Sequence, residues 1–149
     1  MGIFILGFLL LAHLGLGAGS MASNLTDRNL DHILCRDITF YKHANLGTIR
    51  DGIEYLRAHD PQDRWVCHQP GGGCCSRVAC EYSSAIYVCN DDEGADVRVS
   101  LSAVADMAES ITQQDRCVWR PSSGHVVLGQ AFDDGGWNVI VGIKGGDWC

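Results

Sequence analysis

Two segments of the chain carry hydrophobic residues at helical spacing. In residues 46–60, LGTIRDGIEYLRAHD, the residues Ile49, Ile53 and Leu56 recur at positions i, i+4 and i+7, on one face of a helix. Pro61 marks the end of that helix. In residues 99–114, VSLSAVADMAESITQQ, the apolar face comprises Leu101, Val104, Ala105, Ala108 and Ile111. The pattern predicts two amphipathic helices, and Ser100 or Ser102 is expected to cap the second.

Other segments have the β-branched, aromatic and apolar character of strands, and they are residues 37–42, 83–90, 125–133 and 137–144. Residues 134–136, Asp-Gly-Gly, predict a hairpin turn between the last two. Residues 23–34 are polar and are expected to be loose, and residues 60–82 are expected to form a long loop. The order strand-helix-strand-helix-strand-strand predicts an α+β fold. It would be an α/β-sandwich in which two helices pack on one face of a largely antiparallel sheet.

The first residues of the chain predict an export signal. Residues 3–16, IFILGFLLLAHLGL, are apolar except for His13, and small residues follow them. An apolar core ahead of small residues resembles a secretory signal, here cleaved after Ser20 or Ala22. The alternative is a retained membrane anchor, because the stretch borders on the roughly 18 apolar residues that a span requires. The signal interpretation predicts a signal peptide over residues 1–22 and one cysteine-rich secreted domain over residues 23–149, with no stable membrane span after cleavage.

All eight cysteines lie after this segment, and three of them crowd into the stretch GGGCCSRVAC at residues 71–80. An even number of cysteines in a small exported domain predicts a framework of disulfide bonds. Its members would be Cys35, Cys67, Cys74, Cys75, Cys80, Cys89, Cys117 and Cys149. The sequence leaves roughly one hundred pairings open. The alternatives are a redox centre or zinc bound near Cys67 and His68, but the stretch contains no Cys-x-x-Cys spacing. No metal or cofactor is predicted.

The net charge and one sequon add to this picture. The formal net charge is −7, and an acidic chain with scattered Lys and Arg is not expected to bind nucleic acid through the phosphate backbone. Asn24-Leu25-Thr26 is an N-glycosylation sequon close to the expected new N-terminus. Glycosylation of Asn24 is therefore predicted, with an unused sequon as the alternative.

Three features of the second half of the chain resemble a known group of proteins. They are SAIYVCND at residues 84–91, GQAFDDGGWNVIV at residues 129–141 and the terminal Cys149. Over roughly residues 83–149 the chain resembles small secreted cysteine-rich fungal proteins, some of which are called effectors. Its layout is also similar to that of the virally encoded killer toxins secreted by fungi.

The resemblance implies an α/β-sandwich, about four disulfides and a role outside the producing cell. For an effector that role is virulence, and for a toxin it is growth inhibition of competing fungi. The toxins act partly through basic surface residues, and this acidic chain has no residue that matches one of them. Within the group, the resemblance therefore favours an effector that acts on a host plant.

Candidate catalytic residues do not form a recognisable pattern. The alternative function is a small secreted hydrolase such as a ribonuclease, which would combine two histidines with a carboxylate and an arginine. The chain could supply His43, Glu54, Arg57 and His125. Their spacing does not favour this set, and the chain contains no Gly-x-Ser-x-Gly nucleophile motif. No catalytic residue is therefore assigned.

A binding protein needs fewer special residues than an enzyme, and the tryptophans are the candidates here. Trp119 with Arg120, and Trp137 beside the hairpin turn, are predicted to contact the partner, because exposed aromatic and arginine side chains dominate binding at interfaces. Trp148 is expected to be structural, since it precedes Cys149. The predicted function is non-enzymatic binding of an unknown host or competitor protein or cell-surface target.

The intact mass of the secreted protein, before and after reduction, tests export and crosslinking together. We expect reduction to add eight hydrogens, one for each cysteine, because every cysteine is bridged. We expect the N-terminus after Ser20 or Ala22, and the same spectrum reports any glycan at Asn24. Free thiols before reduction would contradict the disulfide framework and favour the metal or redox interpretation.

Overall fold

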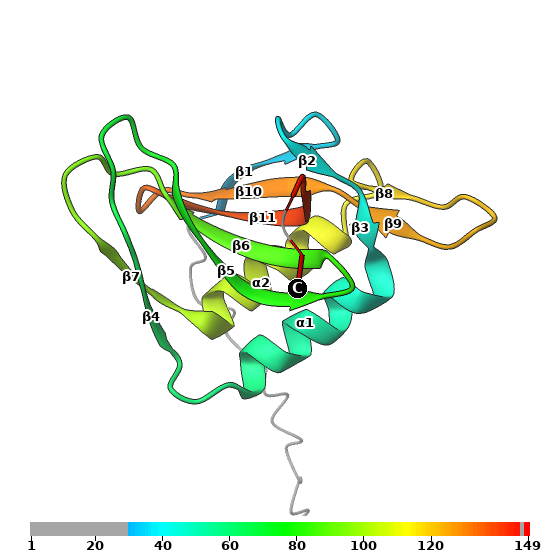
Figure 1. The fold of residues 1–149 in the computed structure, drawn as a ribbon, viewed down its shortest axis with the longest axis horizontal. Helices are drawn as coiled ribbons and strands as arrows, with labels where there is room; N and C mark the ends of the chain where they lie inside the picture. Colours follow the sequence, from blue (N-terminus) through cyan, green and yellow to red (C-terminus); the bar gives the residue numbers. More distant parts are fainter. Residues whose placement is uncertain (1–29, 147) are drawn as a thin grey trace, which may run out of the picture.

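A computed structural model describes residues 30–146 and 148–149, so the predicted signal peptide and Asn24 lie outside the described residues. The fold is α+β, as predicted, with two helices on one side of an antiparallel sheet (Figure 1). The elements in chain order are β1 (Leu30–Cys35), β2 (Tyr41–Lys42), β3 (Ala44–Asn45), α1 (Leu46–Ala58), β4 (Asp63–Val66), β5 (Cys74–Glu81), β6 (Ser84–Asn90), β7 (Val97–Ser100), α2 (Leu101–Thr112), β8 (Val118–Trp119), β9 (Val126–Val127), β10 (Gly129–Asp133) and β11 (Trp137–Lys144).

The main sheet has the strand order β1-β10-β11-β6-β5, and β2 pairs with β11 beyond the end of β10. All of these pairs are antiparallel. Gly142 of β11 lets β2 approach, because a Cβ atom there would lie 3.1 Å from the carbonyl oxygen of Lys42 and 2.9 Å from Leu128. Two small sheets, β3-β9-β8 and β4-β7, lie at opposite ends of the molecule (Figure 1).

Helix α1 forms where the hydrophobic pattern predicts it. Its N-cap is Asn45, whose side-chain oxygen accepts a hydrogen bond of 3.0 Å from the backbone N–H of Thr48. Its buried face consists of Leu46, Ile49, Ile53 and Leu56. This apolar stripe packs the helix against β5 and β6 and against α2.

Gln62 connects the end of α1 to the start of α2. Its Nε2 donates hydrogen bonds to the carbonyl oxygens of Leu56 at 3.1 Å and His59 at 2.6 Å. These carbonyls lie at the C-terminal end of α1, where the helix provides no N–H groups to pair with them. Its Oε1 accepts a hydrogen bond of 2.9 Å from the backbone N–H of Ser102. Ser100 is the N-cap of α2, but its side chain makes no capping bond. The prediction of Ser100 as the cap residue is therefore confirmed in position, but the capping bond comes from Gln62, which tertiary structure brings to the N–H of Ser102.

The sheet is buried on both faces. On the helix face, Val88 of β6 and Val139 of β11 belong to the large hydrophobic cluster that includes both helices. The opposite face carries a smaller cluster, formed by Ile38, Ala85, Tyr87, Cys89, Leu128 and Ile140. Tyr41 packs against this smaller cluster, so the chain before and within β2 covers the face that the helices leave open.

Four disulfides join all eight cysteines, which confirms the predicted framework and supplies the pairing. The bridges are Cys35–Cys117, Cys67–Cys74, Cys75–Cys89 and Cys80–Cys149. Residues 71–73 all have positive φ and form the tight turn that leads into β5. Neighbouring residues of a strand point to opposite faces, and this is why Cys74 and Cys75 reach different partners.

The structure corrects four expectations about strands and loops. Residues 60–82 are not one long loop, because β4 and β5 lie within them. Residues 30–35 are not loose but form β1 against β10, whereas the strand expected at residues 37–42 is reduced to β2. The segment 125–133 is divided between β9 and β10 at Leu128. Short edge strands form hydrogen bonds with partners that are distant in sequence. Their own local sequences are polar, and for this reason the hydrophobic pattern does not predict them.

The bridge Cys35–Cys117 is expected to stabilise the fold more than Cys67–Cys74. Their sequence separations are 82 and 7 residues. From the loss of conformational entropy in the unfolded chain, bridges that close loops of these lengths are expected to stabilise the fold by about 4.5 and about 2.5 kcal/mol, respectively. We expect Cys35→Ala/Cys117→Ala to lose about 2 kcal/mol more unfolding free energy than Cys67→Ala/Cys74→Ala in denaturant titrations. Equal losses would show that loop length does not set the contribution of these bridges.

Candidate functional site

The residues considered for a ribonuclease-like set are not brought together. His43 precedes β3 and His125 precedes β9, so the two histidines lie at opposite ends of the antiparallel β3–β9 ladder. Glu54 lies on α1, and the helical rise places it about 12 Å along the axis from Leu46, the first residue of the helix. These side chains therefore do not converge on one substrate.

Arg57, the fourth member of that set, belongs to the contact between the helices. Its Nη2 donates hydrogen bonds of 2.7 Å to Asp106 Oδ1 and of 2.7 Å to Glu109 Oε2 on α2. The hydrogen bonds to Glu109 and then Asp106 raise the pKa of Arg57 above its ordinary value. The guanidinium therefore holds α1 against α2 and is not placed to bind a phosphate.

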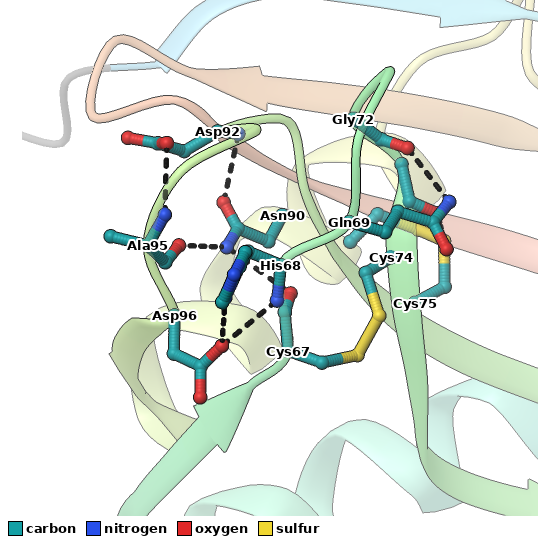
Figure 2. The surroundings of a disulfide bond; sticks show 12 residues. Cys67, His68, Gln69, Gly72, Cys74, Cys75, Asn90, Asp92, Ala95 and Asp96 are labelled. Atoms are coloured by element: carbon teal, nitrogen blue, oxygen red, sulfur yellow. Dashed lines mark hydrogen bonds and ion pairs between the residues drawn. A yellow bond between two sulfur atoms is a disulfide. The ribbon is translucent and has the colours of Figure 1, made fainter.

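An exposed imidazole–carboxylate pair lies beside the Cys67–Cys74 bridge (Figure 2). Asp96 Oδ1 lies 2.6 Å from His68 Nδ1 and accepts a hydrogen bond of 2.9 Å from the backbone N–H of His68. These bonds lower the pKa of Asp96, so the contact weakens as the pH falls through that lowered value. Asn90 Nδ2 joins the same two loops by donating to the carbonyl oxygens of Cys67 at 3.2 Å and Ala95 at 2.7 Å.

This pair is not arranged for nucleophilic catalysis. A nucleophile would stand within hydrogen-bond reach of the imidazole. Within residues 30–146 and 148–149, no hydroxyl or thiol bonds to His68, and the sulfur of Cys67 is in a disulfide. The pair ties the loop after β4 to the loop before β7.

The structure separates Trp137 from Trp119 and Arg120, the other two residues predicted to bind a partner. Trp119 on β8 is 58% exposed, and Arg120 beside it is exposed as well. Trp137 is only 9% exposed, because its side chain lies on the helix face of β11 within the large cluster. Trp119 contacts His43 beside β3, at a ring distance of 6.1 Å. Trp137 is therefore a core residue, and the expectation that it contributes to an exposed surface is corrected.

Four exposed aromatic residues belong to segments that follow or adjoin the end of β11, and we call this part of the surface the aromatic end. It comprises Phe40, Tyr82, Trp119 and Trp148, which are 82%, 84%, 58% and 81% exposed. Trp65, which is 63% exposed, belongs to β4 at the other end of the molecule (Figure 1). Trp148 was expected to be structural because it precedes the bridged Cys149, but its side chain faces solvent, so that expectation is corrected.

Direct contacts hold the segments of the aromatic end together. The backbone N–H of Gly145 donates to the carbonyl oxygen of Phe40 at 3.3 Å. Cys149 is bonded to Cys80, two positions before Tyr82, and the N–H of Ser83 lies 3.2 Å from the Cys149 sulfur. The C-terminus, the β5–β6 turn and the turn before β2 therefore form one surface.

Two of these aromatic residues have backbone conformations that L residues rarely adopt. Phe40 has φ 69° in a turn closed by a 3.1 Å hydrogen bond from Tyr41 N–H to the Ile38 carbonyl oxygen, a position that type II turns reserve for Gly or Asn. Tyr82 and Ser83, with φ 47° and 64°, form the two-residue β5–β6 turn, where Asn-Gly is favoured. This conformation costs roughly 1–2 kcal/mol per residue. Burial does not offset the cost, because Phe40 and Tyr82 are exposed.

Sequence analysis did not identify Phe40 or Tyr82 as site residues. Phe40 lies in a segment with strand character, where an aromatic residue predicts burial. Tyr82 lies in a segment with the sequence character of a loop, so the sequence predicts no hairpin turn there. An Asn-Gly pair would have signalled the turn, but Tyr-Ser does not.

In the part of the chain that the structure describes, no helix is both long enough and apolar enough to cross a membrane. In that same part, no three Cys, His, Asp or Glu side chains cluster as a metal site would require. All eight cysteines are oxidised, so the chain offers no thiolate for zinc.

The chain matches no protein-family model, and comparisons with curated proteins and with solved structures find no significant match. The resemblance to fungal effectors and killer toxins stays a prediction. What the structure defines is a class, a disulfide-stabilised α+β domain with an exposed aromatic surface at one end.

Relief of strain in the β5–β6 turn is expected to stabilise the fold. We expect Tyr82→Asn/Ser83→Gly to raise the free energy of unfolding by about 1 kcal/mol, because Asn and Gly adopt positive φ more readily. Denaturant unfolding with all four disulfides intact measures the change, and Trp65→Thr, an exposed aromatic removed from β4, is the control without a gain. A loss of stability in the turn variant would show that the Tyr82 side chain makes contacts that outweigh the strain.

Proposed function

We propose that the chain is a secreted, disulfide-rich effector or killer-toxin-like protein that binds a host or competitor target through the aromatic end and performs no catalysis. One observation carries this proposal. The side chains of Phe40 and Tyr82 are 82% and 84% exposed, and the backbone of both residues has a left-handed conformation. Backbone strain that is not offset by burial of the side chain is characteristic of functional sites. Exposed aromatic side chains supply much of the binding energy at protein interfaces.

The crosslinks support an extracellular role. Disulfides form and persist in oxidising compartments, and they are rare in the cytosol. Every cysteine of the chain is bridged. The apolar N-terminal segment resembles a secretory signal, which would deliver the chain to such a compartment.

The same crosslinks suit the aromatic end to binding. The bridge Cys80–Cys149 joins the C-terminus, which carries Trp148, to the strand that leads into Tyr82. A surface that is already ordered loses less conformational entropy on binding than a flexible one. The aromatic end therefore meets its target as a preformed surface.

Binding of labelled mature protein to plant cells and to fungal cells, measured by flow cytometry, tests the proposal. We expect the variant Phe40→Asn/Tyr82→Asn to bind at least about tenfold more weakly to the susceptible cells, because two exposed aromatic contacts are removed. Both substitutions relieve backbone strain, so weaker binding would not reflect unfolding.

The matched control is Trp65→Thr, which removes an exposed aromatic from the other end of the molecule and is expected to bind normally. Equal binding by all three proteins, or an equal loss in the control, would refute a role for the aromatic end. Degradation of RNA by the unaltered protein would favour the hydrolase alternative.

A further inference from the structure

The outer edge of β5 is open along its second half. β5 is the last strand of the main sheet, so only one of its sides pairs with β6. Its first residues lie beside β4, to which the Cys67–Cys74 bridge connects them. From Val78 to Glu81, no described strand pairs with the outer side. An edge of this kind presents unpaired N–H and C=O groups to any extended chain that approaches it.

A groove of about 350 Å³ follows this open edge between β5 and α1. Its helix side is lined by Thr48, Ile49, Asp51, Gly52 and Tyr55, and its strand side by residues 78–81 of β5 together with Ser84 and Ile86 of β6. Gly52 brings the helix close to the sheet, since a Cβ atom there would lie 3.3 Å from Ile86 and 3.4 Å from Ala79. A second hollow of about 250 Å³ shares Tyr55 and Val78 with the first and leads on to Arg64.

The ends of the groove carry opposite charges. Asp51 and Glu81 line the first hollow and are exposed, and neither forms an ion pair or hydrogen bond with another residue of the described chain. Arg64 lines the second hollow and is likewise exposed and unpaired within the described residues. A ligand that complements both ends has a cationic group at one end and an anionic group at the other.

The geometry favours a short segment over the edge of a second copy. The register of β5 against β6 shifts between Arg77 and Ala79, which leaves Val78 without a partner on β6. A bulge of this kind bends an edge strand and prevents long edge-to-edge pairing. Three disulfides fix β5, so its open edge is rigid before any ligand arrives.

We propose that this groove binds an extended segment of the protein target, which adds to β5 as a further strand. The backbone of the segment pairs with residues 78–81, a Lys or Arg of the segment meets Asp51 and Glu81, and an acidic residue meets Arg64. The proposal rests on the proposed binding function and names the class of partner, a protein with an exposed, extended segment that carries a basic residue. Apolar side chains of the segment would face Ile49 and Val78.

Peptide libraries test the groove directly on the mature, fully oxidised protein. One library consists of capped octapeptides with a fixed central lysine, and a second carries glutamate in its place. We expect the lysine library to shift the amide NMR signals of residues 78–81 and of α1, and the glutamate library to leave them unchanged. Methylation of alternate backbone nitrogens in the best lysine peptide is expected to abolish binding, because strand pairing needs those N–H groups.

Charge reversal provides the matched variants. Asp51→Lys/Glu81→Lys is expected to weaken the lysine peptide about tenfold and to strengthen its glutamate analogue, since attraction becomes repulsion. Asp37→Lys/Glu93→Lys makes the same change of charge at exposed sites outside the groove and is expected to bind normally.

Each other outcome overturns the proposal. Equal binding of the methylated peptide would exclude strand addition, and equal effects of the two charge-reversed variants would exclude the groove. Shifts at residues 78–81 that depend on protein concentration, without peptide, would identify a second copy as the occupant. If the unaltered protein binds cells but no library peptide, the groove proposal fails while the binding function of the aromatic end stands.

Discussion

Three of the four disulfides lie on strand β5, and this concentration of crosslinks is the constraint on which the rest of the structure depends. One ties β5 to the end of β4, one ties it to β6, and one ties it to the C-terminus. Edge strands are ordinarily among the least protected parts of a sheet. Here the edge is covalently fixed, and both surfaces that we assign to binding border on it. The groove runs along its outer side, and Tyr82 lies in the turn that follows it.

The magnitudes explain how such a small domain tolerates strained surface residues. Each left-handed residue with a Cβ atom costs roughly 1–2 kcal/mol. Each bridge contributes roughly 2–4 kcal/mol. The stabilisation from the crosslinks therefore exceeds the strain at Phe40, Tyr82 and Ser83. A chain without the bridges would be expected to place Gly or Asn at these turns, and the aromatic end would lose two of its members.

Its negative net charge distinguishes this protein from the basic killer toxins to which a resemblance is predicted from the sequence. The net charge is −7, and the groove is bordered by the carboxylates of Asp51 and Glu81, which pair with no other described residue. Complementary charge chiefly sets the rate and the specificity of association, whereas buried aromatic contacts set most of the affinity. We therefore propose different tasks for the aromatic end and the acidic groove, and a single target with a basic extended segment would satisfy both.

The sequence by itself determined the two helices and the number of crosslinks. Ile49, Ile53 and Leu56 repeat at the helical period within one short segment, so local order is enough to predict α1. An even set of cysteines behind a segment that resembles an export signal likewise predicts bridges without predicting partners. The positions of β1, β4 and β5, the cap that Gln62 provides and the burial of Trp137 could not be predicted in this way, because each depends on residues distant in sequence. Tertiary structure alone decided the aromatic end as well, since the positive φ of Phe40 and Tyr82 results from turns that β2 and β6 close. Local periodicity is a property of neighbouring residues, whereas pairing, burial and strain arise only when the whole chain has packed.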